Sequence, residues 1–445
     1  MKKINFYKAG LGVALLLLLI VIGMAIAGKG GASGPLLILM FIILSFAVKG
    51  FQATKGLSFT MWMFTAVAAA MFYPQLFLSY GNFKTTALIV PLLQIIMFGM
   101  GSQMSFDDFA GVIKVPKGVL VGFFGHYTIM PLTALLIVKV FHFPPEIAAG
   151  IILVGCVPNG LASNVMSLLC NANLVLAVAV SAVTTIVAPV VTPFLMKIIG
   201  GQYVAINIWS MMMDIINMMI FPIIAGFIFN MINAGDKTRR SRNIQLLAYA
   251  VTILLCNLIY LKVNQVGFSG YLIASAKSLA LWIVLPIVAA MLFRHFLKGD
   301  VKLQKKILSL LSMVGIAVIV TVITAAGQES LLAVGALLLL VVTLQNLGGY
   351  FFGYNAGRLF RLPEKDCRTL AFEVSMSNGG LASGLALTMG NIATIGLAPA
   401  IYGPLMNVTG STLASWWRTR PTREEMAEAR AAAEAAGTEP VVAKQ

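Results

Sequence analysis

The residues best placed for chemistry lie inside two apolar stretches that would otherwise make plain membrane helices. In "FEVSMSNGGLASGLALTMG", the carboxylate of Glu373 precedes an Asn-Gly-Gly run that begins at Asn378. A similar run, Pro158-Asn159-Gly160, lies in "LVGCVPNGLASNVMSLL" in the first half of the chain. Carboxylate, amide and hydroxyl oxygens gathered at one depth are the ligands that hard cations prefer. An acid within a membrane span is by default a candidate for a functional site.

Both runs are expected to interrupt the helix that carries them. Glycine is a poor helix residue, and Pro158 lacks the N–H group that a helix interior needs. Unpaired backbone groups in lipid cost several kcal/mol each, so a break is tolerated where the freed ends bind something. A free helix N-terminus attracts an anion, and a free C-terminus offers carbonyls to a cation. The shared N-G-(G)-L-A-S core favours paired sites over ordinary kinks, although membrane helices do also use Gly and Pro as kinks.

Three ionisable residues lie within the apolar spans, and their roles have to be weighed. Glu373 could instead lie near the end of its span and pair with Arg368. His126, in "VGFFGHYTIMPL", is either a proton or cation group or a hydrogen-bonded structural histidine. Asp214, in "SMMMDIINMMIFP", has no counterpart in the other half, and we interpret it as a packing or cavity-lining residue.

The elements that position these residues are predicted to be membrane helices. The 445-residue chain is 59% hydrophobic and only 10% charged, far below the charge of a soluble domain. Apolar runs close to the length of a membrane helix recur throughout, and the alternation typical of a membrane barrel is weak. We therefore predict an all-α polytopic membrane protein with fourteen spans, at residues 9–27, 35–52, 58–79, 85–104, 117–141, 146–170, 173–199, 205–233, 244–262, 270–294, 306–326, 331–357, 368–390 and 396–417.

The basic charge of +16 is explained by membrane topology rather than by nucleic acid. With both termini in the cytoplasm, most lysines and arginines fall in cytoplasmic loops, as expected of an inner-membrane protein. The sequence has no H-E-x-x-H or P-loop motif and no C-x-x-C spacing, and an intramembrane catalytic set is missing. We therefore predict no enzymatic activity and no nucleic-acid partner.

The two runs fall in the sixth and thirteenth predicted spans, so they cross the membrane in opposite directions. Paired, interrupted spans of opposite direction are typical of secondary transporters built from inverted repeats. Residues 1–57 are predicted to form a two-helix extension. The first helix either stays in the mature protein or is removed after Ala25-Ile26-Ala27. Residues 419–445 are predicted to form a solvated or disordered cytoplasmic tail.

Several stretches resemble the bile acid:sodium symporter family in order along the chain. They include "IIMFGMGSQMSFDDFAGVIKVPKGVLVG", "LVGCVPNGLASNVMSLL", "FEVSMSNGGLASGLAL" and "NVTGSTLASWW". The resemblance implies a ten-helix core of two inverted five-helix repeats, with one broken helix in each. Residues 58–233 would hold the first repeat and the first helix of the second, and residues 302–418 the remainder. The 1–57 pair and an inserted pair at 236–300 lie outside it, so about four helices are additional.

The resemblance also implies sodium-driven transport of an organic anion, with sodium ligands at defined positions. A first sodium site would use Ser163, Asn164, Ser181 and Glu373, with Ala177 standing where a Ser ligand is usual. A second would use Glu373 and the backbone carbonyls of Val374 and Met376. Its two usual Gln ligands are replaced by Ser377 and His126, and an imidazole nitrogen suits a hard cation poorly.

These departures lead to the hypothesis that at most one sodium is coupled and that His126 or Glu373 takes up a proton instead. Asn159, Asn378 and Asn407 are the predicted substrate ligands. Leu161, where bacterial relatives often carry Thr, makes the cavity more apolar, and the lack of a cavity arginine cluster favours a monoanion. A proton-coupled carrier or exporter on the same scaffold is the alternative function, and a membrane sensor without transport is a third.

Overall fold

The protein is a bundle of α-helices with one short β-hairpin. The computed structural model describes residues 2–51, 57–104, 112–234, 239–264 and 268–427. The helices before the first break are α1 (Lys2–Ile26), α2 (Gly34–Ala47), α3 (Ser58–Phe72), α4 (Gln75–Leu78), α5 (Ile89–Gly101), α7 (Pro116–Phe141) and α8 (Pro145–Cys156). The hairpin pairs β1 (Ser79–Tyr80) with β2 (Phe83–Lys84).

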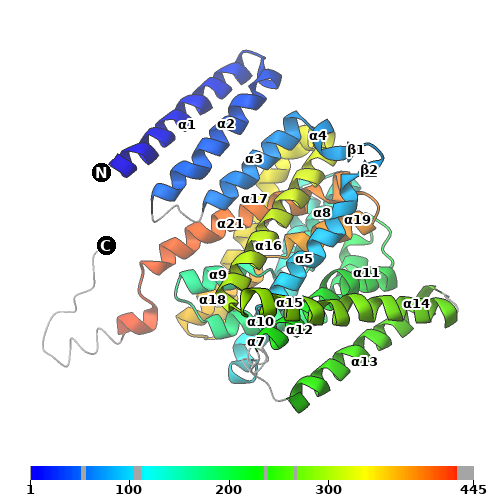
Figure 1. The fold of residues 1–445 in the computed structure, drawn as a ribbon. Helices are drawn as coiled ribbons and strands as arrows, with labels where there is room; N and C mark the ends of the chain where they lie inside the picture. Colours follow the sequence, from blue (N-terminus) through cyan, green and yellow to red (C-terminus); the bar gives the residue numbers. More distant parts are fainter. Residues whose placement is uncertain (1, 52–56, 105–111, 235–238, 265–267, 428–445) are drawn as a thin grey trace, which may run out of the picture.

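The remaining helices run from α9 to α21 (Figure 1). They are α9 (Ala162–Leu169), α10 (Leu174–Leu195), α11 (Ile208–Ile215), α12 (Phe221–Ala234), α13 (Arg239–Asn264), α14 (Phe268–Leu279), α15 (Leu285–Leu297), α16 (Val301–Ala326), α17 (Gln328–Leu359), α18 (Glu364–Ser375), α19 (Gly379–Thr388), α20 (Ile392–Ile395) and α21 (Leu397–Arg418).

These helices confirm the predicted all-α, multi-pass membrane architecture. Within the described residues, nine helices are long and apolar enough to cross a membrane, and five shorter apolar helices fill most of the other predicted spans. Large side chains such as Leu136 and Val190 lie exposed on the outside of the bundle, where lipid would cover them. The fold therefore places apolar side chains both in its interior and on its perimeter.

The sixth and thirteenth predicted spans are broken, as expected. The sixth consists of α8 and α9, separated by the first break at residues 157–161. The thirteenth consists of α18 and α19, separated by the second break at residues 376–378. Each half-helix in front of a break has 12 residues and is therefore about 18 Å long, which brings both breaks near the middle of a bilayer.

The helices that the sequence placed outside the core lie on the edge of the bundle (Figure 1). The helix α1 packs along α2 and α2 along α3, while α15 packs on α12. A π-helical turn precedes Pro222 in α12, and another precedes Pro286 in α15. The two segments therefore share one backbone feature, a π-helical turn before a proline, since proline cannot donate the usual helical hydrogen bond.

A stripe of glycines holds α17 against α18. Gly349, Gly353 and Gly357 follow one another at four-residue spacing on one face of α17. A Cβ atom at Gly353 would lie 2.7 Å from the carbonyl oxygen of Leu370, and one at Gly349 would lie 2.7 Å from Ser375 Cα. Side chains at these positions would push α18 away, so the glycines set the position of the half-helix that carries Glu373.

The start of α18 is held by a buried network of charges. Glu364 accepts hydrogen bonds from Arg368, Arg423 and Tyr354, at 3.2, 2.7 and 2.9 Å. Arg368 therefore pairs with Glu364, and the alternative that it pairs with Glu373 is wrong. Arg368 also donates to the carbonyl oxygens of Trp417, Arg420 and Pro421.

The first residues of the predicted solvated tail are docked against this network. Thr422 and Glu425 bond reciprocally through side chain and backbone, as in a helix capping box, and Thr422 is buried. Glu424 accepts the backbone N–H of Glu364, and Lys365 lies 3.1 Å from Glu425. Residues 419–427 are mostly exposed to solvent, and they also supply partners to the otherwise free N-terminus of α18. Residues 428–445 lie outside the described part.

Replacing Gly353 with Val should destabilise the protein. The added side chain meets backbone of α18, which cannot move without displacing the second break, and overpacking of this kind costs about 1–3 kcal/mol. We expect a lower melting temperature for the purified protein in detergent. Gly335→Val in the same helix is the control, because a Cβ there meets only the flexible side chain of Leu331. Equal melting temperatures for the two variants would contradict the close approach of α17 and α18.

The Glu364 network predicts a pH-dependent contribution to stability. Burial tends to raise the pKa of Glu364, but hydrogen bonds from Arg423, Tyr354 and Arg368 outweigh it and hold the pKa below the ordinary value of 4.5. A lowered folded-state pKa adds stability above the unfolded-state pKa, and this stability is lost as pH falls through the folded-state value. Glu364→Gln should therefore lower the melting temperature at neutral pH, and the difference from wild type should shrink below pH 4.5. Glu329→Gln, at the exposed start of α17, is the control and should leave the melting temperature at neutral pH unchanged.

Candidate functional site

The two breaks meet and bond to each other through their backbones. The N–H of Gly160 donates to the carbonyl of Met376, and the N–H of Asn378 donates to the carbonyl of Pro158, both at 2.8 Å. Asn159 and Ser377 form an antiparallel bridge, so the two segments run in opposite directions where they cross. A Cβ atom on Gly160 would lie 3.3 Å from the carbonyl oxygen of Ser377, which explains the value of glycine here.

Glu373 lies at this crossing, in the last turn of α18, and is fully buried. Its Oε2 atom accepts hydrogen bonds from Asn159 Nδ2 and, at 3.0 Å, from Ser181 Oγ of α10. Asn159 is held in turn by Thr184, whose hydroxyl donates to Asn159 Oδ1 at 2.8 Å. A buried carboxylate needs such donors to offset its lost hydration.

The predicted first-site residues lie together around Glu373. Ser181 Oγ lies 3.3 Å from Asn164 Oδ1. With the Asn164 amide turned over, its Nδ2 would instead donate to Ala177 O at 3.2 Å and Glu373 Oε1 at 3.3 Å. Ser163 is buried in the first turn of α9 and donates to the carbonyl of Gly160 at 2.8 Å. Side-chain oxygens from α9, α10 and α18 therefore gather at one point, and all are ligands that suit a hard cation.

The predicted second-site residues are arranged differently. His126, on α7, faces the carbonyl oxygens of Glu373 and Val374, each 3.0 Å from Nδ1. The carbonyl of Met376 already accepts the N–H of Gly160. Ser377 is buried, and its hydroxyl has no hydrogen-bond partner within the described residues. These groups are close to the crossing, but they do not form a set of free oxygen ligands.

The three predicted substrate residues fall into two kinds of environment. Both ends of the Asn159 amide are engaged, with Glu373 and Thr184. Asn378 caps α19 by accepting the N–H of Leu381 at 3.0 Å. Within the described residues, its Nδ2 has one hydrogen-bond partner, Met97 Sδ at 3.9 Å. Asn407, on α21, is half-buried. Asn378 and Asn407 therefore keep more hydrogen-bonding capacity for a ligand than Asn159 does.

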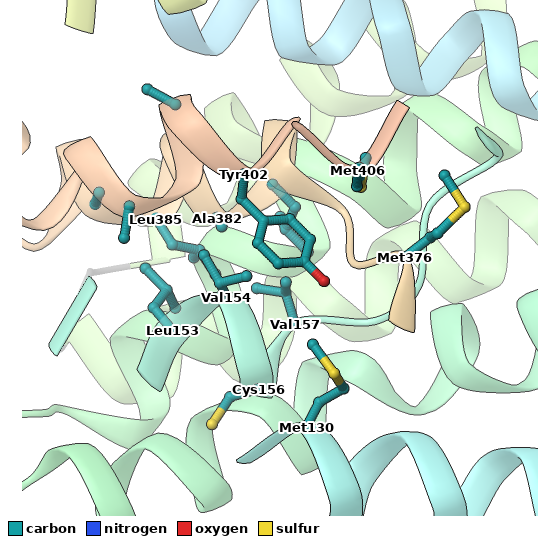
Figure 2. Packing of buried hydrophobic residues seen from close by; sticks show 14 of the residues in the cluster. Met130, Leu153, Val154, Cys156, Val157, Met376, Ala382, Leu385, Tyr402 and Met406 are labelled. Carbon is teal, nitrogen blue, oxygen red and sulfur yellow. The ribbon is translucent and has the colours of Figure 1, made fainter. Parts of the chain in front are cut away.

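A second polar cluster beside the second break escaped the sequence analysis. Asn346 of α17 donates to Ser375 Oγ at 2.8 Å and to Tyr402 Oη at 3.2 Å, and it accepts from Thr409 at 2.6 Å. Tyr402 also donates to the carbonyl of Ser375. Figure 2 shows its hydroxyl directed toward the non-helical segments that carry Val157 and Met376. The only sequence signal was the run of polar residues in otherwise apolar spans.

A cavity of about 630 Å³ opens at the end of the bundle where α8 begins and α19 ends. Glu146, Asn391 and Thr394 line it, and Glu146 accepts hydrogen bonds from the other two. None of the predicted site residues lines this cavity. Asp214, predicted to pack or line a cavity, is half-buried on α11, which packs against α19. Within the described residues, no three His, Cys, Asp or Glu side chains cluster as ligands of a transition metal.

A multi-pass helical protein with two half-helix pairs crossing at mid-depth belongs to the class of secondary transporters. The comparisons with known proteins agree. The profile of the Sodium Bile acid symporter family matches residues 90–267. That match runs past α12 into the segment predicted to be inserted.

Several relatives match over most of the chain. The chain is 30% identical over 371 residues to the uncharacterized sodium-dependent transporter YocS of Bacillus subtilis, which covers 83% of this chain and 94% of YocS. It is 24% identical over 362 residues to the probable sodium/metabolite cotransporter BASS1 of Arabidopsis thaliana, covering 81% of this chain and 73% of BASS1. The human ileal sodium/bile acid cotransporter is 24% identical over 320 residues, covering 71% of this chain and 74% of its own.

The chain therefore belongs to the sodium bile acid symporter family, and the matched relatives are transporters. Among solved structures, the sodium proton antiporter MjNhaP1 of Methanocaldococcus jannaschii aligns over 94% of this chain and 97% of its own, with 15% identity and a TM-score of 0.38. That score is too low to support an inference about fold or function.

Replacing Thr184 with Val should destabilise the crossing. The substitution keeps the shape of the side chain but leaves the buried Oδ1 of Asn159 without its donor, which costs about 1–3 kcal/mol. The melting temperature of the purified protein should fall. Thr185→Val is the control at the next position, because the buried hydroxyl of Thr185 has no hydrogen-bond partner within the described residues. It should be neutral or stabilising, and the opposite order would contradict this arrangement.

Proposed function

We propose that the protein carries a small organic anion across the cell membrane together with sodium. The observation that supports this most directly is the buried Glu373 carboxylate beside Ser181 and Asn164 at the meeting point of two broken helices. A buried acid without a basic partner is unfavourable unless a cation joins it. In its sodium-bound form the site would therefore be stabilised, and sodium would be released when the site opens.

The first site has the right chemistry for this ion. Carboxylate, hydroxyl and amide oxygens are preferred by hard cations, and Glu373, Ser181, Asn164 and Ser163 supply them. The Asn164 amide can contribute in two ways. In one orientation, Nδ2 donates a hydrogen bond to Glu373 Oε1, and the carboxylate has a partner without an ion. In the other orientation, Oδ1 lies toward Ser181 and adds an oxygen ligand to the first site. We propose that sodium binding selects the second orientation.

The anion would bind at the free ends of the helices that follow the breaks. The helix α19 starts at the second break, and its N-terminus carries partial positive charge. Asn378 lies at that end with a nearly free Nδ2, and Asn407 lies on α21, which packs against α19. We propose these two amides as the substrate ligands. Asn159, which the sequence also suggested, would act through Glu373 instead.

Ion and anion would be coupled because one short segment serves both. Residues 376–378 join the helix that carries Glu373 to the helix capped by Asn378. Ordering this segment around sodium would therefore prepare the anion site. The names of the relatives refer to metabolites and bile acid, and we propose a small carboxylate of the metabolite kind. We also propose an inner-membrane location with both termini in the cytoplasm, from the positive-inside pattern.

This proposal predicts that uptake of a carboxylate into proteoliposomes requires sodium and Glu373. A panel of labelled small monocarboxylates would be tested with sodium chloride and with choline chloride outside. A hydrogen bond to a charged group is worth about 1.5–3 kcal/mol. If the contact of the carboxylate with sodium is of the same order, Glu373→Gln should weaken sodium activation by about 10–150-fold.

Glu329→Gln is the matched control, since Glu329 lies exposed in the first turn of α17. It should transport like wild type. Uptake that proceeds equally in choline chloride, or that survives Glu373→Gln with unchanged sodium dependence, would rule out sodium coupling at this acid. Uptake driven by a pH gradient alone would favour the proton-coupled alternative.

A further inference from the structure

One imidazole fills the point where the C-terminal ends of two half-helices converge. His126 is fully buried in α7. Its Nδ1 lies 3.0 Å from the carbonyl oxygens of both Glu373 and Val374, and its Nε2 lies 2.8 Å from the carbonyl oxygen of Val157. The structure gives the ring no other hydrogen-bond partner within the described residues, so each ring nitrogen faces carbonyl oxygen.

These three carbonyls are the kind of group that holds a cation in a membrane. Glu373 and Val374 belong to the last turn of α18, and Val157 directly follows the end of α8. The last carbonyls of a helix have no intrahelical partner and carry partial negative charge. Two such ends directed at one point form a cation site, as in transporters with interrupted helices.

Neighbouring carbonyls at the same ends already have partners. Phe372 O accepts the N–H of Met376, and Met376 O accepts the N–H of Gly160. On the other half-helix, Cys156 O accepts the hydroxyl of Thr192 at 2.8 Å. Partnered carbonyls therefore surround the point where the oxygens of Glu373, Val374 and Val157 meet the ring of His126.

The groups at this point do not fit a second sodium ion. The ring stands in the space between the carbonyls, and it offers nitrogen where a hard cation requires oxygen. Ser377 is fully buried with an unpartnered hydroxyl and lacks the length of the Gln that the resemblance places there. The first site around Ser181 and Asn164 keeps its oxygen ligands.

Given the sodium coupling proposed above, we infer that His126 closes the second cation position with its own side chain, so that the chain binds one sodium ion where its scaffold could hold two. The ring fills the space between the carbonyls. It donates to one half-helix end when neutral and to both ends when protonated, so this position needs no second sodium ion. Symport of one sodium with a monoanion would move no net charge, and the membrane potential would then not drive it.

The inference is tested by counting bound sodium, with no need for a known substrate. Purified full-length protein in detergent is equilibrated with radioactive sodium chloride, at constant ionic strength made up with choline chloride. Wild type is expected to bind one ion per chain at saturation. His126→Gln and the double variant His126→Gln/Ser377→Gln restore amide oxygens at this point, and each is expected to bind one ion more than wild type.

His142→Gln is the matched control, because His142 lies exposed at the C-terminal end of the same helix. It should bind as wild type does. Two ions on wild type would overturn the inference without any variant. No gain in either Gln variant that elutes as a folded monodisperse protein would also overturn it.

The same counts separate this inference from the proposed function. Wild type that binds no sodium would contradict sodium coupling at Glu373, whereas the difference between wild type and the Gln variants reports on His126 alone. A gain of one ion in the variants supports closure of the second position, whether wild type binds one sodium ion or none.

Discussion

The structure depends on the backbone hydrogen bonds that the two breaks make with each other. Each break frees N–H and C=O groups at a depth where water cannot satisfy them, and every group left unpaired would cost several kcal/mol. The pairs Gly160–Met376 and Asn378–Pro158 remove that cost by joining the breaks as a short antiparallel bridge. Neither break could exist in lipid alone, so the two interrupted spans require each other.

This mutual pairing also places a buried acid between two opposed helix ends. Glu373 sits in the last turn of one half-helix, and Asn159, from the other break, donates to it. Ser181 and Thr184 of α10 complete the set of donors. Because the donors come from separate elements, a movement of either half-helix changes the surroundings of the carboxylate. That is the property that coupling between an ion and a second ligand requires.

The outer ends of the half-helices are secured by charge, whereas their inner ends are secured by backbone pairing. Glu364 and Arg368 anchor the start of α18 to residues 419–427, and the glycines of α17 allow its close approach along the rest of its length. The added helices lie at the edge, where α1 packs on α2, α2 on α3 and α15 on α12, and they leave the crossing to the core helices. The half-helix α18 is therefore held along its length and ends at the second break, which has three residues.

The sequence alone determined the membrane class, the broken spans and their opposite directions. A helix in lipid must be long and apolar, and a polar or helix-breaking residue within it is costly. Glu373 and the two Asn-Gly runs can therefore be recognised from the sequence. The sequence could not show which polar groups face one another, because contacts such as Asn159 with Thr184 or Asn346 with Tyr402 join segments that are distant along the chain. The sequence left open whether His126 is a proton or cation group or a structural histidine, whereas the tertiary structure placed its ring among carbonyls at the ends of two other helices. The reason is physical: hydropathy acts on each helix separately, whereas a binding site depends on how helix ends are brought together.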